Sequence, residues 1–105
     1  LRVFDYVGDT VKTLANIVDN FIPGEVYNIG SDEGWGVDIK TLSDLILEKT
    51  GMDESIVTYA PNEPFTTKTK IVDLSKSRRD LMHKATINLS EGLDLYIDWM
   101  KKTYL

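Results

Sequence analysis

The sequence predicts an α/β fold, a small mixed lobe of about four helices and three or four short strands. Two kinds of apolar spacing occur along its 105 residues: short β-branched or aromatic runs, and longer stretches with apolar residues three or four positions apart. Proline and glycine separate these stretches, most clearly at Pro23, Gly24 and Gly51. The length is that of one domain, residues 1–105.

Four segments have the composition of strands. Residues 2–7 alternate apolar and polar side chains, and residues 26–29 form an apolar run that ends at a glycine. Residues 56–59 and 71–72 are shorter runs of the same kind. We expect these segments to be extended and paired.

Four further stretches predict helices, each with an apolar stripe that we expect to be buried. The expected N-caps are small polar residues ahead of each stripe: Asp9, Asp38, Asp73 or Ser75, and Ser90. Gly51 is placed to end the second helix in the left-handed conformation. Three or four short strands cannot cover so many apolar helix faces, so we expect the lobe to pack against a neighbour.

Composition excludes several functional classes. The net charge of −5 is a poor match for nucleic acid or an anionic membrane, and no apolar stretch is long enough to span a bilayer. Without cysteine the chain has no disulfide, no thiolate catalysis and no cysteine-based zinc site. Together with the lack of a signal-peptide pattern, this favours a cytoplasmic protein.

Few residues indicate chemistry by themselves. Arg2 precedes a strand, and its planar guanidinium suits a phosphate, although a surface arginine is the alternative. Lys68 and Lys70 begin a basic stretch that is either a solvated face or a local anion site. The single histidine, His83, is expected at the surface near a helix end, and no metal site is expected.

Five motifs in sequence resemble those of the extended short-chain dehydrogenase/reductases that act on nucleotide sugars. They are R-V-F-D-Y-V-G-D (2–9), G-E-V-Y-N-I-G-S (24–31), the helix at 38–51, D-L-S-K-S-R-R-D-L (73–81) and L-S-E-G-L-D-L-Y-I-D-W (89–99). Each motif is weak alone, but their order and spacing agree over essentially the whole chain. Because the chain starts at Leu1, inside the first expected strand, we expect it to be part of a longer protein.

The resemblance implies the C-terminal, nucleotide-sugar-binding lobe of an NAD-dependent epimerase/dehydratase, with the dTDP-glucose 4,6-dehydratase and UDP-glucose 4-epimerase branches nearest. Such lyases and isomerases of carbohydrate biosynthesis carry an N-terminal Rossmann domain. That domain holds NAD and a Tyr-x-x-x-Lys pair, whose tyrosine is the base while hydride leaves sugar C4. This chain has neither the pair nor the glycine fingerprint, so the resemblance implies that it supplies no catalytic, cofactor or metal residue and is inactive alone.

The resemblance also implies partners and substrate contacts. The partners are a nucleotide-diphosphate sugar, the chain's own N-terminal Rossmann domain and a second copy of the parent enzyme in a homodimer. Arg2 matches the family arginine that contacts the diphosphate. The family's second arginine, in P-x-R-P-G-D, is replaced by Glu63, so Lys68 or Lys70 is expected to take its role.

The alternative function is a non-catalytic, acidic α/β module for protein interaction. Glu63 at the phosphate-arginine position and the net charge of −5 favour this alternative. The gene upstream of Leu1 distinguishes the two, because only the enzyme requires a glycine-rich βαβ unit and Tyr-x-x-x-Lys there.

Overall fold

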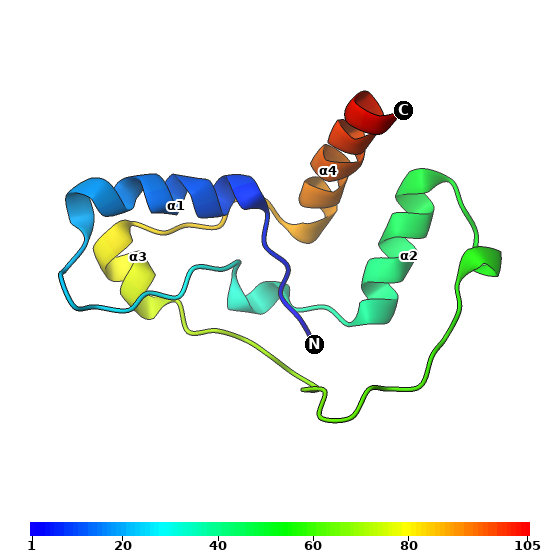
Figure 1. Ribbon diagram of the computed structural model, residues 1–105, viewed down its shortest axis with the longest axis horizontal. Helices are drawn as coiled ribbons and strands as arrows, with labels where there is room; N and C mark the ends of the chain where they lie inside the picture. Colours follow the sequence, from blue (N-terminus) through cyan, green and yellow to red (C-terminus); the bar gives the residue numbers. More distant parts are fainter.

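The computed structural model describes all 105 residues as four helices, two short 3-10 turns and long extended connections (Figure 1). The helices and turns are α1 (Val7–Asn20), η1 (Glu33–Trp35), α2 (Ile39–Thr50), η2 (Glu54–Ile56), α3 (Ser75–Leu81) and α4 (Leu89–Tyr104). The number of helices agrees with the expectation from the sequence.

The expected α/β class is wrong, because the structure has no β-sheet. Its strand-like pairing consists of two isolated bridges, both at Arg2: an antiparallel bridge to Val37 and a parallel bridge to Lys70. The other segments predicted as strands run without a partner. The fold is therefore helical, with extended connections.

The error has a simple physical cause. An alternating or β-branched pattern shows that a segment suits a pleated surface, but a strand also needs a neighbour for its backbone groups. Val26 and Tyr59, taken as strand residues, are 78% and 70% exposed. The sequence pattern carries no information on whether that neighbour lies within the same chain.

Two helix boundaries follow the sequence prediction closely. At the start of α2, the Asp38 side chain accepts a hydrogen bond of 2.7 Å from the Thr41 backbone N–H. Its last turn ends at Gly51, whose φ of +68° lies in the left-handed region. At α3 the predicted cap, Asp73 or Ser75, is wrong, because the helix starts at Ser75 and its N-cap is Leu74, which makes no side-chain bond. Asp73 instead accepts a bond of 2.9 Å from the Ser75 N–H, one residue ahead of the cap position.

Two other predicted caps are wrong. The first helix begins at Val7, before Asp9, whose carboxylate turns away from the helix end toward the segment preceding α4. The last helix begins at Leu89, and the side chain of Asn88, rather than Ser90, accepts a 2.9 Å bond from the Glu91 N–H. Several small polar residues precede each helix, and any of them could cap it.

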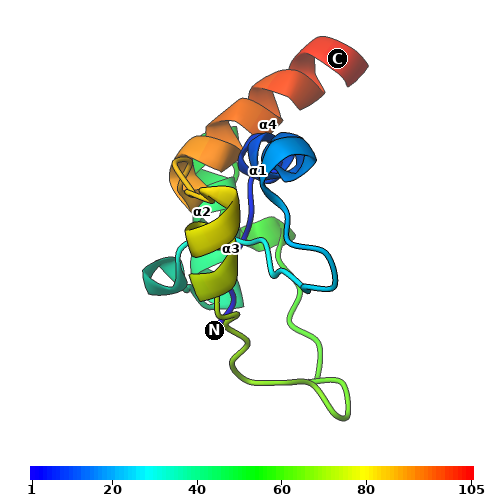
Figure 2. The same ribbon diagram turned by 90° about the vertical axis from the view of Figure 1, so that its left-hand side faces the viewer.

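The helices form two pairs on either side of the N-terminal segment (Figures 1 and 2). Helix α1 packs on α3, and α2 contacts α4. The chain is flat and open, with extents of 51 × 37 × 21 Å and a radius of gyration of 16.5 Å, against about 13 Å for a compact domain of this length. Its accessible surface of 7875 Å² also exceeds the roughly 5,900 Å² expected for its mass.

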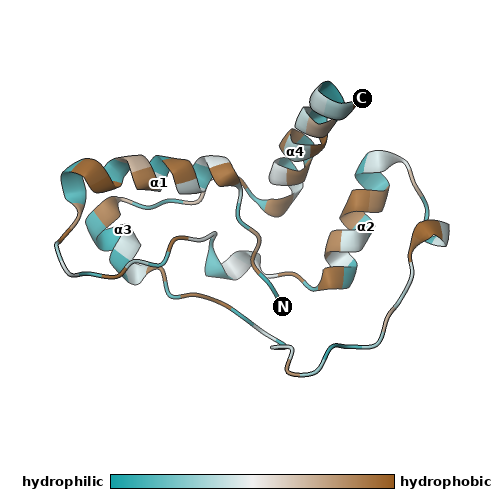
Figure 3. Cartoon of the chain, viewed as in Figure 1, coloured by the Kyte–Doolittle hydropathy of each residue, from teal (hydrophilic) through white to brown (hydrophobic).

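Little of the apolar surface is buried within the chain. Leu74 and Leu81, at the two ends of α3, are the fully buried apolar residues. The stripe expected to be buried on α1 is exposed instead, with Val11 at 54% and Val18 at 77%. Brown, apolar bands on α1, α2 and α4 mark these helices in Figure 3. The prediction of buried stripes is therefore wrong within this chain.

Polar side chains hold α1 to the chain that follows α3. The Asp9 carboxylate, 3% exposed, accepts hydrogen bonds from the backbone N–H groups of Thr86 (3.0 Å) and Ile87 (2.9 Å) and from the Thr86 hydroxyl (2.8 Å). We call this contact the Asp9 clamp. Burial by itself raises the pKa of Asp9, but the bonds from Ile87 and Thr86 outweigh it, so the pKa lies below its usual 3.8.

The prediction that His83 lies at the surface is wrong, because its side chain is buried. Its Nε2 lies 2.6 Å from the Gly30 carbonyl oxygen, and its Nδ1 lies 2.6 Å from the Thr13 hydroxyl. Because a carbonyl only accepts, Nε2 carries the proton, and in the neutral ring Nδ1 accepts from Thr13. The ring therefore joins α1 to the 30–36 segment.

The end of α3 offers a direct test of backbone strain. Met82 has a φ of +54°, a left-handed conformation that costs a residue with a Cβ about 1–2 kcal/mol, and its side chain is 62% exposed. Met82→Gly is expected to raise the free energy of unfolding by about 0.5–1 kcal/mol in chemical denaturation. The control is Gly51→Ala, which should lower it because Gly51 has the same left-handed geometry. A destabilised Met82→Gly would contradict this account.

No helix in the structure combines the length and the apolar composition needed to cross a bilayer.

Candidate functional site

Three segments that are distant in sequence meet at Arg2. Its backbone N–H and carbonyl each form a 2.8 Å bond with Val37, while the Lys70 N–H donates to the Leu1 carbonyl at 3.2 Å. The first residues therefore lie between the segment that leads into α2 and the long connection that precedes α3. This pairing fixes the backbone positions around the predicted phosphate residue.

The Arg2 side chain is half-buried and turns toward the long connection. One terminal nitrogen donates to the Leu1 carbonyl at 2.9 Å, and the other donates to the Thr67 carbonyl. A guanidinium has five N–H donors, so these two bonds leave three for an external acceptor. The side chain thus holds the 62–68 loop in place and keeps hydrogen-bonding capacity for a ligand.

A surface hollow of about 550 Å³ lies beside Arg2. Its walls are the Leu1–Arg2 segment, residues 37–39 and residues 62–68 of the loop, with Asn62 at one end and Lys68 at the other. We call it the Arg2 hollow. It brings together two of the predicted substrate residues, Arg2 and Lys68.

The structure places the three predicted substrate residues close to one another, but in different roles. Arg2 and Lys68 line the Arg2 hollow, whereas Lys70 pairs with Arg2 through its backbone and is not part of the lining. Glu63 also lines the hollow, so the carboxylate that replaces the family arginine lies in the same hollow as the two cations. The hollow therefore offers both anion-binding and hydroxyl-accepting groups.

Asp38 is a second carboxylate in the Arg2 hollow. The backbone N–H and the side chain of Thr41 lower its pKa, so it stays ionised at neutral pH. One of its oxygens caps α2, and a carboxylate has further acceptor sites beside that bond. An alcohol can donate to such an oxygen, whereas a phosphate dianion is repelled by it.

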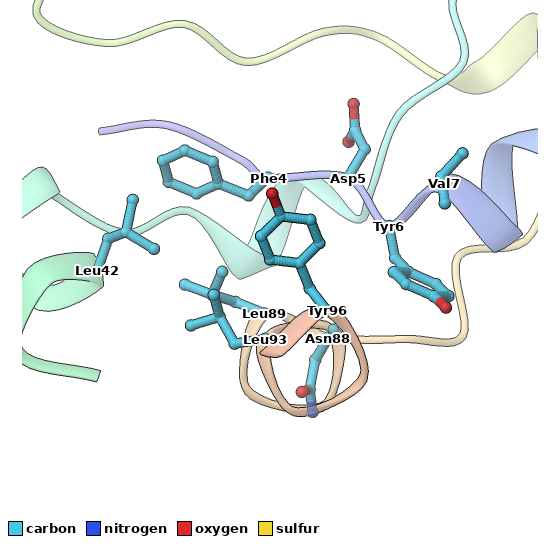
Figure 4. Close-up of a pocket in the computed structure, with 10 residues that line it drawn as sticks. Phe4, Asp5, Tyr6, Val7, Leu42, Asn88, Leu89, Leu93 and Tyr96 are labelled. Atoms are coloured by element: carbon cyan, nitrogen blue, oxygen red, sulfur yellow. The ribbon is translucent and has the colours of Figure 1, made fainter. Parts of the chain in front are cut away.

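A separate, apolar groove lies between the N-terminal segment, α2 and α4 (Figure 4). It has a volume of about 310 Å³ and is lined mainly by Phe4, Leu42, Leu89, Leu93 and Tyr96. Figure 4 shows these side chains converging from the N-terminal segment, α2 and α4. Such a groove suits an apolar neighbour better than a charged substrate.

The glycine-bearing 30–36 segment does not fit a dinucleotide. Asp32 caps the turn η1 by accepting from the Gly34 N–H at 2.8 Å, and Glu33 forms a two-point ion pair with Arg78 at 3.0 and 2.6 Å. The bond from Arg78 also lowers the pKa of Glu33. The carboxylates of Asp32 and Glu33 in this segment would repel a pyrophosphate rather than bind it.

Phe65 is the site residue that the sequence reasoning did not single out. It lines the Arg2 hollow, has a positive φ of +63° and is fully exposed. A signal for it was present, because the family pattern P-x-R-P-G-D has glycine where this chain has Phe65. An aromatic residue at a position where the family has glycine marks Phe65 as a residue whose side chain needs an explanation.

Comparisons with known proteins agree with the resemblance noted in the sequence. No protein-family model matches the chain. The sequence is 29% identical over 108 aligned positions to dTDP-glucose 4,6-dehydratase of Escherichia coli, covering 94% of this chain and 30% of that protein. The fold matches the crystal structure of the Bordetella bronchiseptica enzyme WbmF in complex with NADH, with a TM-score of 0.77, 30% identity, and coverage of 96% of this chain and 29% of that one.

The chain is thus related to the short-chain dehydrogenase/reductases of the NAD-dependent epimerase/dehydratase group, which confirms the resemblance noted in the sequence. It spans about a third of the length of each relative. The match to a solved enzyme also shows that the open, helical arrangement occurs within a larger protein.

Proposed function

We propose that the chain is the C-terminal, nucleotide-sugar-binding lobe of an NAD-dependent nucleotide-sugar epimerase or dehydratase. The observation that carries the proposal is the match over 94% of the chain to dTDP-glucose 4,6-dehydratase, together with the fold shared with an NADH-bound enzyme. In this proposal the lobe binds the substrate, and another part of the protein holds NAD and performs hydride transfer.

The Arg2 hollow supports this role. A diphosphate accepts hydrogen bonds from the free N–H groups of Arg2 and lies near Lys68, while Glu63 and Asp38 accept from sugar hydroxyls. Lys70 follows the same loop and adds positive charge at its end. The chain's contribution is binding and orientation, and no residue in the hollow is assigned as an acid, base or nucleophile.

The exposed apolar faces support an interdomain role for the lobe. The surface excess, roughly 2,000 Å² above that of a compact chain, is of the size that a stable interface buries. We propose that an N-terminal Rossmann domain of the same polypeptide packs against part of this exposed apolar surface. We also propose that the complete enzyme is a cytoplasmic homodimer. This packing also explains how so open a chain could be stable.

Replacing Arg2 tests the proposal in the complete gene product. Arg2→Ala should raise KM for dTDP-glucose or UDP-glucose about 10- to 100-fold, since a charged hydrogen bond to phosphate contributes about 1.5–3 kcal/mol. The affinity for NAD should not change, because the cofactor is bound elsewhere. Steady-state kinetics and NAD titration measure the two effects separately.

Two further variants make the result specific. Arg2→Lys should recover part of the affinity, because it restores the charge but not the fork geometry. Lys102→Ala removes a positive charge from α4, outside the hollow, and should leave KM unchanged. If the wild-type gene product binds neither NAD nor a nucleotide sugar, the interaction-module alternative replaces the enzymatic proposal.

A further inference from the structure

The turn at the rim of the Arg2 hollow is built on an unfavourable residue. Pro64 occupies its second position and Phe65 its third, and the Thr66 hydroxyl donates to the Glu63 carbonyl at 2.9 Å. A turn with positive φ at the third position strongly favours glycine, yet Phe65 adopts a φ of +63°. A side chain with a Cβ makes that conformation unfavourable.

No packing of the Phe65 side chain within the chain offsets this cost. The Phe65 side chain is fully exposed, the most exposed of the large apolar side chains. Strained backbone that persists without packing is a sign that the side chain serves a purpose beyond folding. The side chain is therefore held where an external group can reach it.

The surroundings of Phe65 specify the chemistry of that group. Arg2 and Lys68 line the same hollow, and the Arg2 side chain bonds the Thr67 carbonyl, two residues after Phe65. Glu63 and Asp38 add carboxylate acceptors. An aromatic face, two cations and two hydroxyl acceptors together match a nucleobase, a diphosphate and sugar hydroxyls.

We propose that Phe65 is the stacking platform for the base of a nucleoside diphosphate whose phosphates bind Arg2 and Lys68. This assignment rests on the proposed function and names how the site recognises the nucleotide. The base supplies affinity that a diphosphate alone cannot gain here, because Glu63 opposes the phosphate charge. Phe65 thus compensates for the missing second arginine.

The test uses the complete gene product and two probes, thymidine diphosphate and inorganic pyrophosphate, in calorimetric titrations. Phe65→Gly should weaken thymidine diphosphate binding about tenfold, as expected for the loss of one base–aromatic contact, and leave pyrophosphate binding unchanged. The same variant should unfold at an equal or higher denaturant concentration, because glycine suits the turn. Phe65→Trp should retain the affinity, and Phe65→Leu should lose it.

Each other outcome has a definite meaning. Unchanged thymidine diphosphate binding in Phe65→Gly overturns the platform, while the proposed function stands if the wild type binds. Equal loss for both probes also overturns it, since the loop would then act only on the phosphates. A changed oligomeric state with unchanged nucleotide affinity overturns it in favour of a protein contact. If the wild type binds neither probe, the proposed function falls together with the platform.

Discussion

Asp9→Ala is expected to lower the free energy of unfolding of the complete protein by about 3 kcal/mol. The substitution leaves the N–H groups of Thr86 and Ile87 without the acceptor that now binds them at 3.0 and 2.9 Å. Hydrogen bonds to a charged group contribute about 1.5–3 kcal/mol each, and the three bonds of the Asp9 clamp are not additive. Urea denaturation followed by circular dichroism measures the loss.

The Asp9 clamp also predicts a pH dependence. The folded pKa of Asp9 lies below the unfolded value of about 3.8, so its stabilisation is complete above that value and disappears as pH falls through the folded pKa. Wild-type stability should therefore fall between about pH 5 and pH 2. Part of this slope remains in Asp9→Ala, because Asp80, held by Arg79, has a pKa of about 2.

A surface aspartate serves as the control. Asp98 pairs with Lys102 on α4 and is largely exposed, so Asp98→Asn should change the stability by less than about 0.5 kcal/mol. If Asp9→Ala and Asp98→Asn behave alike, the clamp does not hold α1 to the C-terminal region.

His83→Ala is expected to destabilise the protein by a similar amount, about 3 kcal/mol. It removes a buried ring and leaves the Thr13 hydroxyl and the Gly30 carbonyl without their partner. Thermal unfolding of the complete protein measures the effect. The matched control is the neighbouring Lys84→Ala, an exposed position that should be nearly neutral.

A conservative variant separates the hydrogen bonds from the packing. His83→Phe fills the space but restores neither bond, so it should recover only the share of stability lost to the cavity. Full recovery in His83→Phe would show that the ring acts by volume alone and that the bonds to Thr13 and Gly30 contribute nothing.

Local features of the fold were accessible from the sequence, and tertiary ones were not. The cap at Asp38 and the left-handed end at Gly51 depend on a few adjacent residues, and both predictions were correct. The role of Asp9 depends on Thr86, 77 residues away, so a local capping rule assigned it wrongly. The predicted strands failed for the same reason, because pairing partners are not encoded in a segment's own pattern.

The site shows the same division. Arg2, Lys68 and Lys70 were identified from a family resemblance, and the structure brings their backbones together, although their binding role remains a prediction. Phe65 was missed because exposure and a positive φ are properties of the folded turn. The sequence shows that Phe65 replaces a family glycine, but only the structure shows that Phe65 has a positive φ and lines the Arg2 hollow.

The Asp9 clamp has a consequence for how the chain acquires its structure during synthesis. The clamp joins residues 77 positions apart and so closes a loop, at an entropy cost of about 4 kcal/mol. The hydrogen bonds of the clamp contribute a stabilisation of similar size. The Asp9 clamp therefore cannot stabilise α1 until Ile87 has left the ribosome. Until then, α1 is stabilised only by other surfaces that it contacts. Assembly of this lobe is a late event, completed from its C-terminal end.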